Sequence, residues 1–259
     1  MIRKTSIGLL AAMLAAGAAG ALSAQTAEEL IEKNIQAKGG REKLKAVKTV
    51  RVTGKMVGQM GEFPVSMEML PPAHKVRFDF VVQGMTGTSA YDGQGGWQVM
   101  PFLGKTDPEP MSAEDLKEAK EEADFLGPLF DYKDKGNQVE LLGKGDLEGT
   151  PVYKLKLTEK SGDVSTIYLD AETYLELKEE SSKTMRGQVV ELERTFGDYK
   201  KVDGLTFPFT METKSKGQQA AQTLSITKLE LNVDVAASRF DMPKVQKKKE
   251  ETAPPPKPN

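Results

Sequence analysis

The sequence contains no cysteine and only one histidine, His74, among its 259 residues. The missing cysteine excludes disulfide scaffolds, thiol nucleophiles, iron–sulfur clusters and zinc sites built from thiolates. One histidine is too few for a three-histidine zinc site or a two-histidine iron site. We therefore expect neither a metal site nor a cofactor in this protein.

Positively and negatively charged residues are nearly equal in number. Lys and Arg total 36 against 38 Asp and Glu, and hydrophobic residues make up 38% of the chain. This composition is not that of a multi-span membrane protein. Residues 1–24 contribute +2 and residues 244–259 contribute +3 to the net charge of −2, so the part between them carries about −7. An acidic body argues against nucleic acid as a partner.

The longest apolar run lies at the N-terminus. Arg3 and Lys4 precede the apolar residues 7–22, and small residues follow, with Ala24 as the best cleavage position. This order is typical of a secretory signal peptide, which we predict over residues 1–24. The alternative is a membrane anchor, for which the run is short. The predicted signal implies export to a bacterial periplasm.

The C-terminal residues 244–259 contain five Lys, two Glu and a run of prolines, without apolar periodicity. Such a segment cannot bury enough apolar surface to fold, so we predict a disordered tail. No low-complexity linker interrupts the remaining residues, 25–243. Their number suits one domain, which we predict over this range.

Capping patterns predict two helices. Thr26, followed three residues later by Glu29, is a capping-box pattern before an apolar stripe, and Gly39-Gly40 is a stop signal. Ser112 begins a second helix over residues 112–122 by the same pattern.

Elsewhere the apolar residues alternate with a period of two, which indicates β-strands with one apolar face. The clearest runs are residues 63–69, 75–82, 153–157, 205–211 and 222–233. Pro208 indicates an edge position or a bulge in its run, and a change of phase between Ile226 and Leu229 indicates another bulge. Turn signals separate the runs at hairpin spacing, so the sheet should be an antiparallel meander.

About ten strands and two substantial helices predict a mainly β fold of the α+β type. A sheet with one apolar face must bury that face. Curling into a barrel or half-barrel, with helices over the concave apolar side, is the most economical solution.

No motif for covalent chemistry is found. The glycines at 143, 145 and 149 do not have the spacing of a dinucleotide fingerprint, and a Gly-x-Ser-x-Gly elbow is absent from the sequence. His74 could act as a general base, but no nucleophile is identifiable, so we interpret it as a surface residue. Carboxylates are abundant, and counting alone does not exclude a glycosidase-like pair. We predict no catalytic residue and no enzymatic activity.

Several motifs, taken together in this order, resemble a known family. Tyr91-Asp92-Gly93 with Trp97 and Pro101 resembles the DG…W…P hairpin of LolA, the family of periplasmic carriers of outer-membrane lipoproteins. Residues 237–243 are similar to that family's closing A…F…P segment, and residues 71–78 lie where the family has its P…F strand. Residues 123–129, 168–170 and 203–208 resemble a broader set of exported, lipoprotein-sorting-like proteins.

The resemblance implies an eleven-stranded antiparallel half-barrel whose open apolar side is covered by helices. It also implies a cavity for the acyl chains of a lipoprotein or another lipid, an inner-membrane donor, an outer-membrane acceptor and no covalent chemistry. We expect a monomer. The residues expected to line the cavity are Val52, Met67, Met69, Phe78, Phe80, Trp97, Leu129, Phe130, Phe207 and Phe209.

Two alternatives remain open from the sequence. The first is an envelope sensor or scaffold that uses the same fold to bind a protein partner, through an exposed apolar patch or strand edge. The second is an enzyme acting on envelope glycan or lipid, which requires a cleft with convergent carboxylates of shifted pKa.

Overall fold

The computed structural model describes residues 25–244 except residues 186 and 219–220. The predicted signal peptide, residues 1–24, lies outside the described residues, as do residues 245–259 of the predicted tail. Within the described part of the chain, no helix is both long enough and apolar enough to cross a membrane.

The first predicted helix is confirmed as α1 (Ala27–Ala37) with its capping box. Thr26 Oγ1 accepts a hydrogen bond from the Glu29 amide at 3.2 Å, and the Thr26 amide donates to Glu29 Oε2 at 3.0 Å. Beyond α1, a β-carbon at Gly39 would lie 2.6 Å from the Gly204 carbonyl oxygen. Its φ of +119° also favours glycine, so the chain can turn tightly here. A short helix that the sequence did not predict follows, α2 (Arg41–Lys45).

The second predicted helix is confirmed as α3 (Ala113–Glu122). Ser112 Oγ accepts from the Asp115 amide at 3.1 Å, which satisfies one of the amides left unpaired at a helix start. Three single-turn 3-10 helices are also described. They are η1 (Pro71–Ala73), η2 (Pro101–Leu103) and η3 (Ala237–Arg239).

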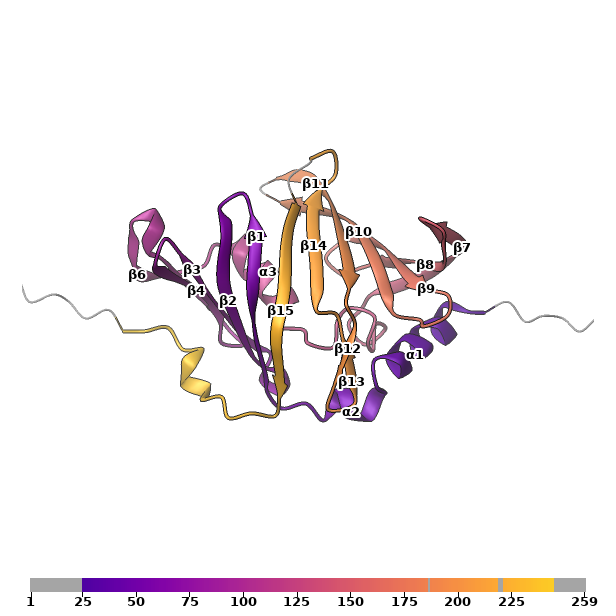
Figure 1. The fold of residues 1–259 in the computed structure, drawn as a ribbon, viewed down its shortest axis with the longest axis horizontal. Coiled ribbons are helices and arrows are strands. Elements are labelled where there is room, and N and C mark those ends of the chain that lie inside the picture. The colour runs from indigo at the N-terminus through magenta and orange to yellow at the C-terminus, as the bar shows by residue number, and fades with distance from the viewer. Residues whose placement is uncertain (1–24, 186, 219–220, 245–259) are drawn as a thin grey trace, which may run out of the picture.

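The strands form one open antiparallel sheet of thirteen strands, which is not closed into a barrel (Figure 1). The prediction of ten to eleven strands was therefore too low. The members are β1 (Val50–Gly58), β2 (Gly61–Leu70), β3 (Lys75–Val82), β4 (Met85–Tyr91), β5 (Gly96–Met100), β6 (Lys105–Pro110), β7 (Gln138–Leu147), β8 (Thr150–Thr158), β9 (Val164–Asp170), β10 (Glu176–Met185), β11 (Gln188–Gly197), β14 (Thr210–Ser215) and β15 (Ala221–Leu231).

The order across the sheet is β6-β5-β4-β3-β2-β1-β15-β14-β11-β10-β9-β8-β7. Neighbours in space are mostly neighbours in sequence, as predicted for a meander, but β1 pairs with β15 in the middle of the sheet. The register between these two strands shifts at Thr53/Gly54, and Thr227 is the extra residue. This confirms the bulge predicted between Ile226 and Leu229.

One predicted strand, residues 205–211, was wrong as a single element. It is divided at Pro208 into β13 (Leu205–Phe207) and the sheet strand β14. The short β12 (Lys200–Val202) pairs with β13 in a separate two-stranded ribbon. Proline has no amide hydrogen to donate to a neighbouring strand, so the strand is interrupted at Pro208.

The apolar alternation divides the sheet into two faces. Val52, Met67 and Phe78 are register partners and therefore share one face, which we name the inner face. Arg51, Glu68 and Arg77 are likewise partners on the opposite, outer face. The main core cluster joins the buried side chains of α1, such as Leu30 and Ile35, to inner-face residues of β1, β8 and β9. A second, smaller cluster lies on β2 and β3.

Candidate functional site

An apolar cavity of about 270 Å³ lies between α1, α2, the segment of residues 123–137 and the inner face of the sheet. We name this segment, which joins α3 to β7, the covering segment. Aliphatic and aromatic side chains dominate the cavity wall. They are Ile35, Leu44, Phe125, Leu126, Leu129, Phe130, Ile167, Phe196 and Phe207. A concave apolar wall with a few polar groups is the usual character of a small-molecule site.

The covering segment is fixed to α2 by charge and aromatic contacts. The Arg41 guanidinium lies 4.6 Å from the centroid of the Phe130 ring, and it pairs with the Asp131 carboxylate. Lys45 Nζ lies 2.9 Å from the other oxygen of Asp131. Hydrogen bonds from Lys45 and Arg41 lower the pKa of Asp131, so this contact persists over the physiological range of pH. Gly127, at a φ of +75°, turns the chain before the anchored residues.

The far wall of the apolar cavity contains aromatic groups. The rings of Phe125 and Phe207 have centroids 6.2 Å apart, which joins the covering segment to β13. Tyr199 donates its hydroxyl to the Glu176 carbonyl oxygen at 2.7 Å, and burial raises the pKa of Tyr199, so the phenol stays neutral. On α1, Asn34 Nδ2 donates to the Tyr174 carbonyl oxygen at 2.8 Å. These bonds satisfy two of the polar groups in a wall that also includes Lys38, Glu176, Glu179 and Arg194.

A second cavity, of about 380 Å³, adjoins the first and is predominantly acidic. Glu118, Glu121 and Glu122 of α3 line it together with Glu159 and Glu179. Asp124, Lys183, Leu192, Pro128 and Arg194 complete the wall of this polar cavity.

Three of the carboxylates in the polar cavity have no hydrogen-bond or ion-pair partner among the described residues. They are Glu118, Glu122 and Glu159, and burial is the main cause that raises the pKa of each. Neighbouring carboxylates raise the pKa of Glu118 and of Glu159 further. The side chains of Glu118 and Glu122 are exposed to solvent where they line this cavity, and that of Glu159 is partly buried.

The predicted cavity residues do not form one group. Leu129, Phe130 and Phe207 line the apolar cavity. Val52 and Met69 are buried in the main core cluster, and Met67 packs against it. The wall of the apolar cavity therefore does not include Val52, Met67 or Met69.

Phe78 and Phe80 lie on the inner face in the second cluster, with Phe63 and Phe102. The Phe80 centroid is 5.6 Å from that of Phe78 and 5.7 Å from that of Phe102. We name this group the phenylalanine cluster. It places these two predicted residues away from the apolar cavity.

Trp97 was predicted on the wrong face. It pairs with Ala90, which pairs with Arg77, so its side chain lies on the outer face. There its Nε1 donates to the Phe240 carbonyl oxygen at 2.8 Å. Glycines precede Trp97 in the sequence, so no apolar alternation indicated its direction.

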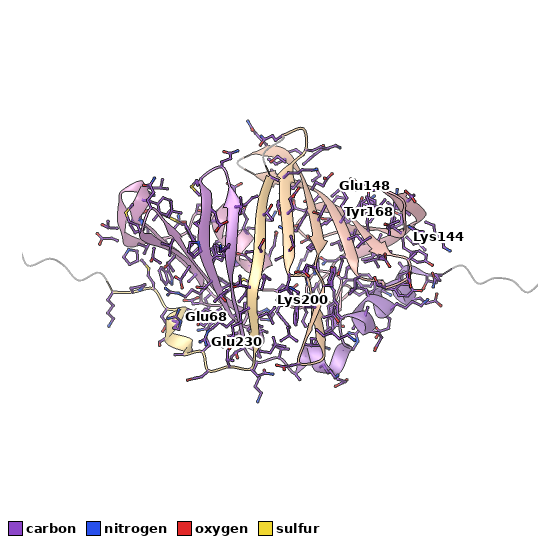
Figure 2. The ribbon with its side chains drawn as sticks, in the orientation of Figure 1. Glu68, Lys144, Glu148, Tyr168, Lys200 and Glu230 are labelled. Atoms are coloured by element: carbon purple, nitrogen blue, oxygen red, sulfur yellow. The ribbon has the colours of Figure 1, made fainter. Side chains whose placement is uncertain are left out.

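The outer face holds the motif at residues 237–243. Phe240 is fully buried, and Arg239 pairs with Glu68, which also accepts from Arg51 Nε at 3.0 Å. Glu68 is labelled in Figure 2, near the C-terminal strand of the sheet. The closing motif and Trp97 therefore have a structural role on the outer face. The last predicted cavity residue, Phe209, is buried outside both clusters, and Lys200 Nζ lies 4.5 Å from its ring centroid.

Sequence reasoning missed several residues of the two cavities. Arg194 and Phe196 alternate on β11 and share the inner face with Thr213 and Met211, their register partners. The alternation was present, but β11 contains too many charged residues to be recognised as a strand with one apolar face. Phe125 was noted only as part of a motif, because no periodicity indicates the direction of a loop side chain.

A further hollow, of about 480 Å³, lies where the β1–β2 and β14–β15 hairpins approach each other. Its wall is mostly polar or small, and Phe63 is its only aromatic residue. His74 is exposed in a turn at a φ of +49°, and so supplies no general base to either cavity. In the part of the chain that the structure describes, no group of three His, Asp or Glu side chains could hold a metal ion.

Comparison with known proteins identifies the fold. No family model matches the sequence, and no curated protein matches it. A DUF1329 family protein from Desulfovibrio piger superposes with a TM-score of 0.59 at 12% identity, covering 84% of this chain and 98% of the other. A LolA superfamily protein from Nitrosomonas europaea gives 0.57 at 13%, with the same coverages.

A third solved structure is a domain from Vibrio parahaemolyticus named for outer-membrane lipoprotein sorting. It gives a TM-score of 0.54 at 16% identity and covers 82% of this chain and 97% of the other. The protein thus has a mainly β, open-sheet fold that it shares with these three structures. Two of them are named as a LolA superfamily protein and a lipoprotein-sorting domain, so the solved structures it is similar to agree with the resemblance found in the sequence. At these identities the match shows the fold alone.

Proposed function

We propose that this protein is a periplasmic carrier that shelters the acyl chains of a lipid or a lipoprotein. The observation that carries the proposal is the apolar cavity between the covering segment and the inner face, with Phe125 and Phe207 in its wall. The fold shared with a LolA superfamily protein and a lipoprotein-sorting domain supports it.

The proposal includes the architecture expected from the resemblance. The thirteen-stranded sheet is the wall of a half-barrel, and α1, α2, α3 and the covering segment lie over its concave side. Residues 25–243 form one domain that acts as a monomer, after removal of the signal peptide over residues 1–24. An inner-membrane donor and an outer-membrane acceptor exchange the cargo.

The energetics of such a carrier need no covalent chemistry. Each buried CH₂ contributes roughly 0.8 kcal/mol, so a few carbons of an acyl chain in the cavity hold a lipid usefully but reversibly. Release requires an acceptor with higher affinity, or movement of the covering segment.

Mass spectrometry tests the proposal. The full chain is expressed with its own N-terminus, recovered from the periplasm of a bacterial host without detergent, and measured under native and denaturing conditions. We expect an additional lipid or lipoprotein mass that is lost on denaturation. A clean apo mass, with no uptake of added lipid, would contradict the carrier function.

A matched pair of variants shows where the lipid binds. Phe125→Glu introduces a carboxylate into the apolar cavity and should remove the bound mass. Leu142→Glu makes the same change at a residue of β7 that is 51% exposed, and should retain the bound mass.

The polar cavity supports one alternative function. Its carboxylates with raised pKa are the feature that a hydrolase acting on envelope lipid or glycan would require. The same mass spectra distinguish the two, because a carrier returns its lipid intact and a hydrolase returns cleaved products. Copurification of one stoichiometric protein without lipid would support the sensor or scaffold alternative instead.

A further inference from the structure

We propose that the polar cavity is a head-group subsite for a zwitterionic phospholipid with a terminal ammonium group. The acyl chains occupy the apolar cavity, the phosphate binds Arg194, and the ammonium group lies among Glu118, Glu122 and Glu159. This inference rests on the proposed carrier function and names the class of lipid that the same site selects.

The first step is the adjacency of the two cavities. They share three wall residues, Pro128, Glu179 and Arg194. An amphiphile can therefore place its chain in one cavity and its head in the other. An exclusively apolar ligand would leave the polar cavity without a role.

The second step is the position and free charge of Arg194. It lines both cavities and so lies at their boundary. Its Nε is 3.4 Å from Thr213 Oγ1, and it forms no ion pair with any residue that the structure describes. Its side chain is exposed, and its positive charge lowers the pKa of the nearby Glu122, against the effect of burial. A guanidinium that forms no ion pair with the described residues can bind phosphate through two parallel hydrogen bonds.

The third step is the charge balance of the polar cavity. Six carboxylates and two cationic side chains line it. Lys183 is already paired with Glu121 at 2.6 Å, and Lys135 pairs with Asp124 from outside the wall. Ser165 Oγ donates to Glu179 at 2.8 Å. Glu118, Glu122 and Glu159 remain without an ion pair among the described residues, although the charge of Lys183 acts on Glu118 and Glu159 and that of Arg194 acts on Glu122. A ligand cation relieves the repulsion that each of them experiences from neighbouring carboxylates.

The order of these features selects the ligand. Apolar side chains dominate the first cavity, Arg194 lies at the boundary beside its register partner Glu179, and the three glutamates line only the polar cavity. The matching ligand is an acyl chain, then a phosphate, then an ammonium group. A phospholipid with a neutral polyol head would satisfy Arg194 but would leave the three carboxylates without a counter-charge.

Binding of two lipids that differ only in the head tests this inference. Fluorescent phosphatidylethanolamine and phosphatidylglycerol with identical acyl chains are offered in neutral carrier vesicles to the full exported chain at pH 7.5. A chelator is present, because a divalent cation held by the carboxylates would alter the charge of the site. We expect phosphatidylethanolamine to bind at least about tenfold more tightly.

The triple variant E118Q/E122Q/E159Q removes the three free carboxylates. We expect the preference to fall to about twofold or less, with phosphatidylglycerol binding as well as before or better. The control E42Q/E148Q/E172Q makes the same change in net charge at three exposed carboxylates without partners, and should keep the preference. Glu148 is labelled in Figure 2 at the β7–β8 turn. Arg194→Gln should weaken both lipids, because both contain the phosphate.

The outcomes separate this inference from the proposed function. If neither lipid binds, the carrier function itself fails. If both bind equally to the natural protein, or if the triple variant keeps the preference, the head-group subsite is overturned while lipid binding stands. The single variant E122Q tests one of the three carboxylates alone, and it should partly reduce the preference for phosphatidylethanolamine over phosphatidylglycerol.

Discussion

The phenylalanine cluster and the apolar cavity lie on the same face of one sheet, but aromatic rings pack against one another in the first and line a cavity in the second. In the phenylalanine cluster, Phe63, Phe78, Phe80 and Phe102 come from neighbouring strands and η2, and their rings fill the space between them. At the apolar cavity, sheet side chains face a loop, the covering segment, instead of another strand.

What covers the sheet therefore determines whether its apolar face becomes part of the core or the wall of a binding site. Strand side chains adapt to one another and reach the density of a protein interior. The covering segment is held by its own contacts, since Asp131 and Phe130 attach it to Arg41 and Lys45 of α2. Because those contacts hold the covering segment at a fixed distance from the sheet, the segment does not pack closely against the sheet, and the apolar cavity remains between them.

The largest expected change in the free energy of unfolding comes from a substitution in the phenylalanine cluster. Phe63→Ala removes a ring that is 6% exposed and leaves a void beside the Phe80 ring, whose centroid lies 6.4 Å away, so we expect a loss of about 4 kcal/mol in the free energy of unfolding. Denaturant titration measures it. Lipid binding to the surviving native protein should be unchanged, and a loss of binding would show that this cluster is not purely core.

A smaller loss of stability and a larger loss of binding are expected at the apolar cavity. Phe207 is partly buried and faces the cavity, so Phe207→Ala should cost about 1.5 kcal/mol of unfolding free energy. The same change should weaken the binding of an acyl probe about tenfold, as titration of probe fluorescence would show. Equal probe affinity in the natural protein and this variant would remove the contrast between the two regions.

The outer face is a third region, and we expect changes there to leave the proposed lipid binding intact. Trp97→Phe keeps most of the ring and removes the hydrogen bond to the Phe240 carbonyl oxygen. We expect a cost of about 1 kcal/mol in thermal or denaturant unfolding, and an unchanged affinity for the probe. A weaker probe affinity would mean that the two faces are coupled.

The smallest effect is expected at Glu122 and depends on pH. Its pKa is raised from the ordinary 4.5, chiefly by burial, so the native state holds its proton more firmly than the unfolded chain does. Between the unfolded and the folded pKa the native state binds more protons, and stability falls as pH rises through that window. Glu122→Gln should therefore stabilise the protein at pH 7.5 and make little difference below pH 4.5.

Melting temperatures of the natural protein and of Glu122→Gln across this pH range check the prediction. The curves should converge toward acid pH and separate toward neutral pH. Parallel curves would show that the Glu122 carboxylate keeps its ordinary pKa in the native state and would contradict the prediction.

Local signals in the sequence determined a large part of the fold. The capping box at Thr26, the N-cap at Ser112, the bulge near Thr227 and the alternation in β2, β3 and β8 depend only on residues close in the chain. Such features are predictable because their energetics are local.

The site was predicted less well, for a physical reason. Alternation shows which residues share a face of a strand, but not what covers that face, so Met69 in the core and Phe207 in the cavity wall had the same signal. The direction of Trp97 depended on its register with Ala90 of β4, and the nearest clear alternation lies two strands away from Trp97, in β3. Arg194 was missed because a polar side chain on an inner face contradicts the pattern that defines such a face.

The pairing of β1 with β15 has a consequence for how the protein reaches its native state. Val50 pairs with Leu231, 181 positions later in the chain, so the centre of the sheet closes only when nearly the whole domain is present. The entropy of closing so large a loop must be paid before the contact is gained, and folds governed by such distant pairs form in milliseconds to seconds. Each half of the sheet can assemble from hairpins on its own, but the two halves become one structure in the last step.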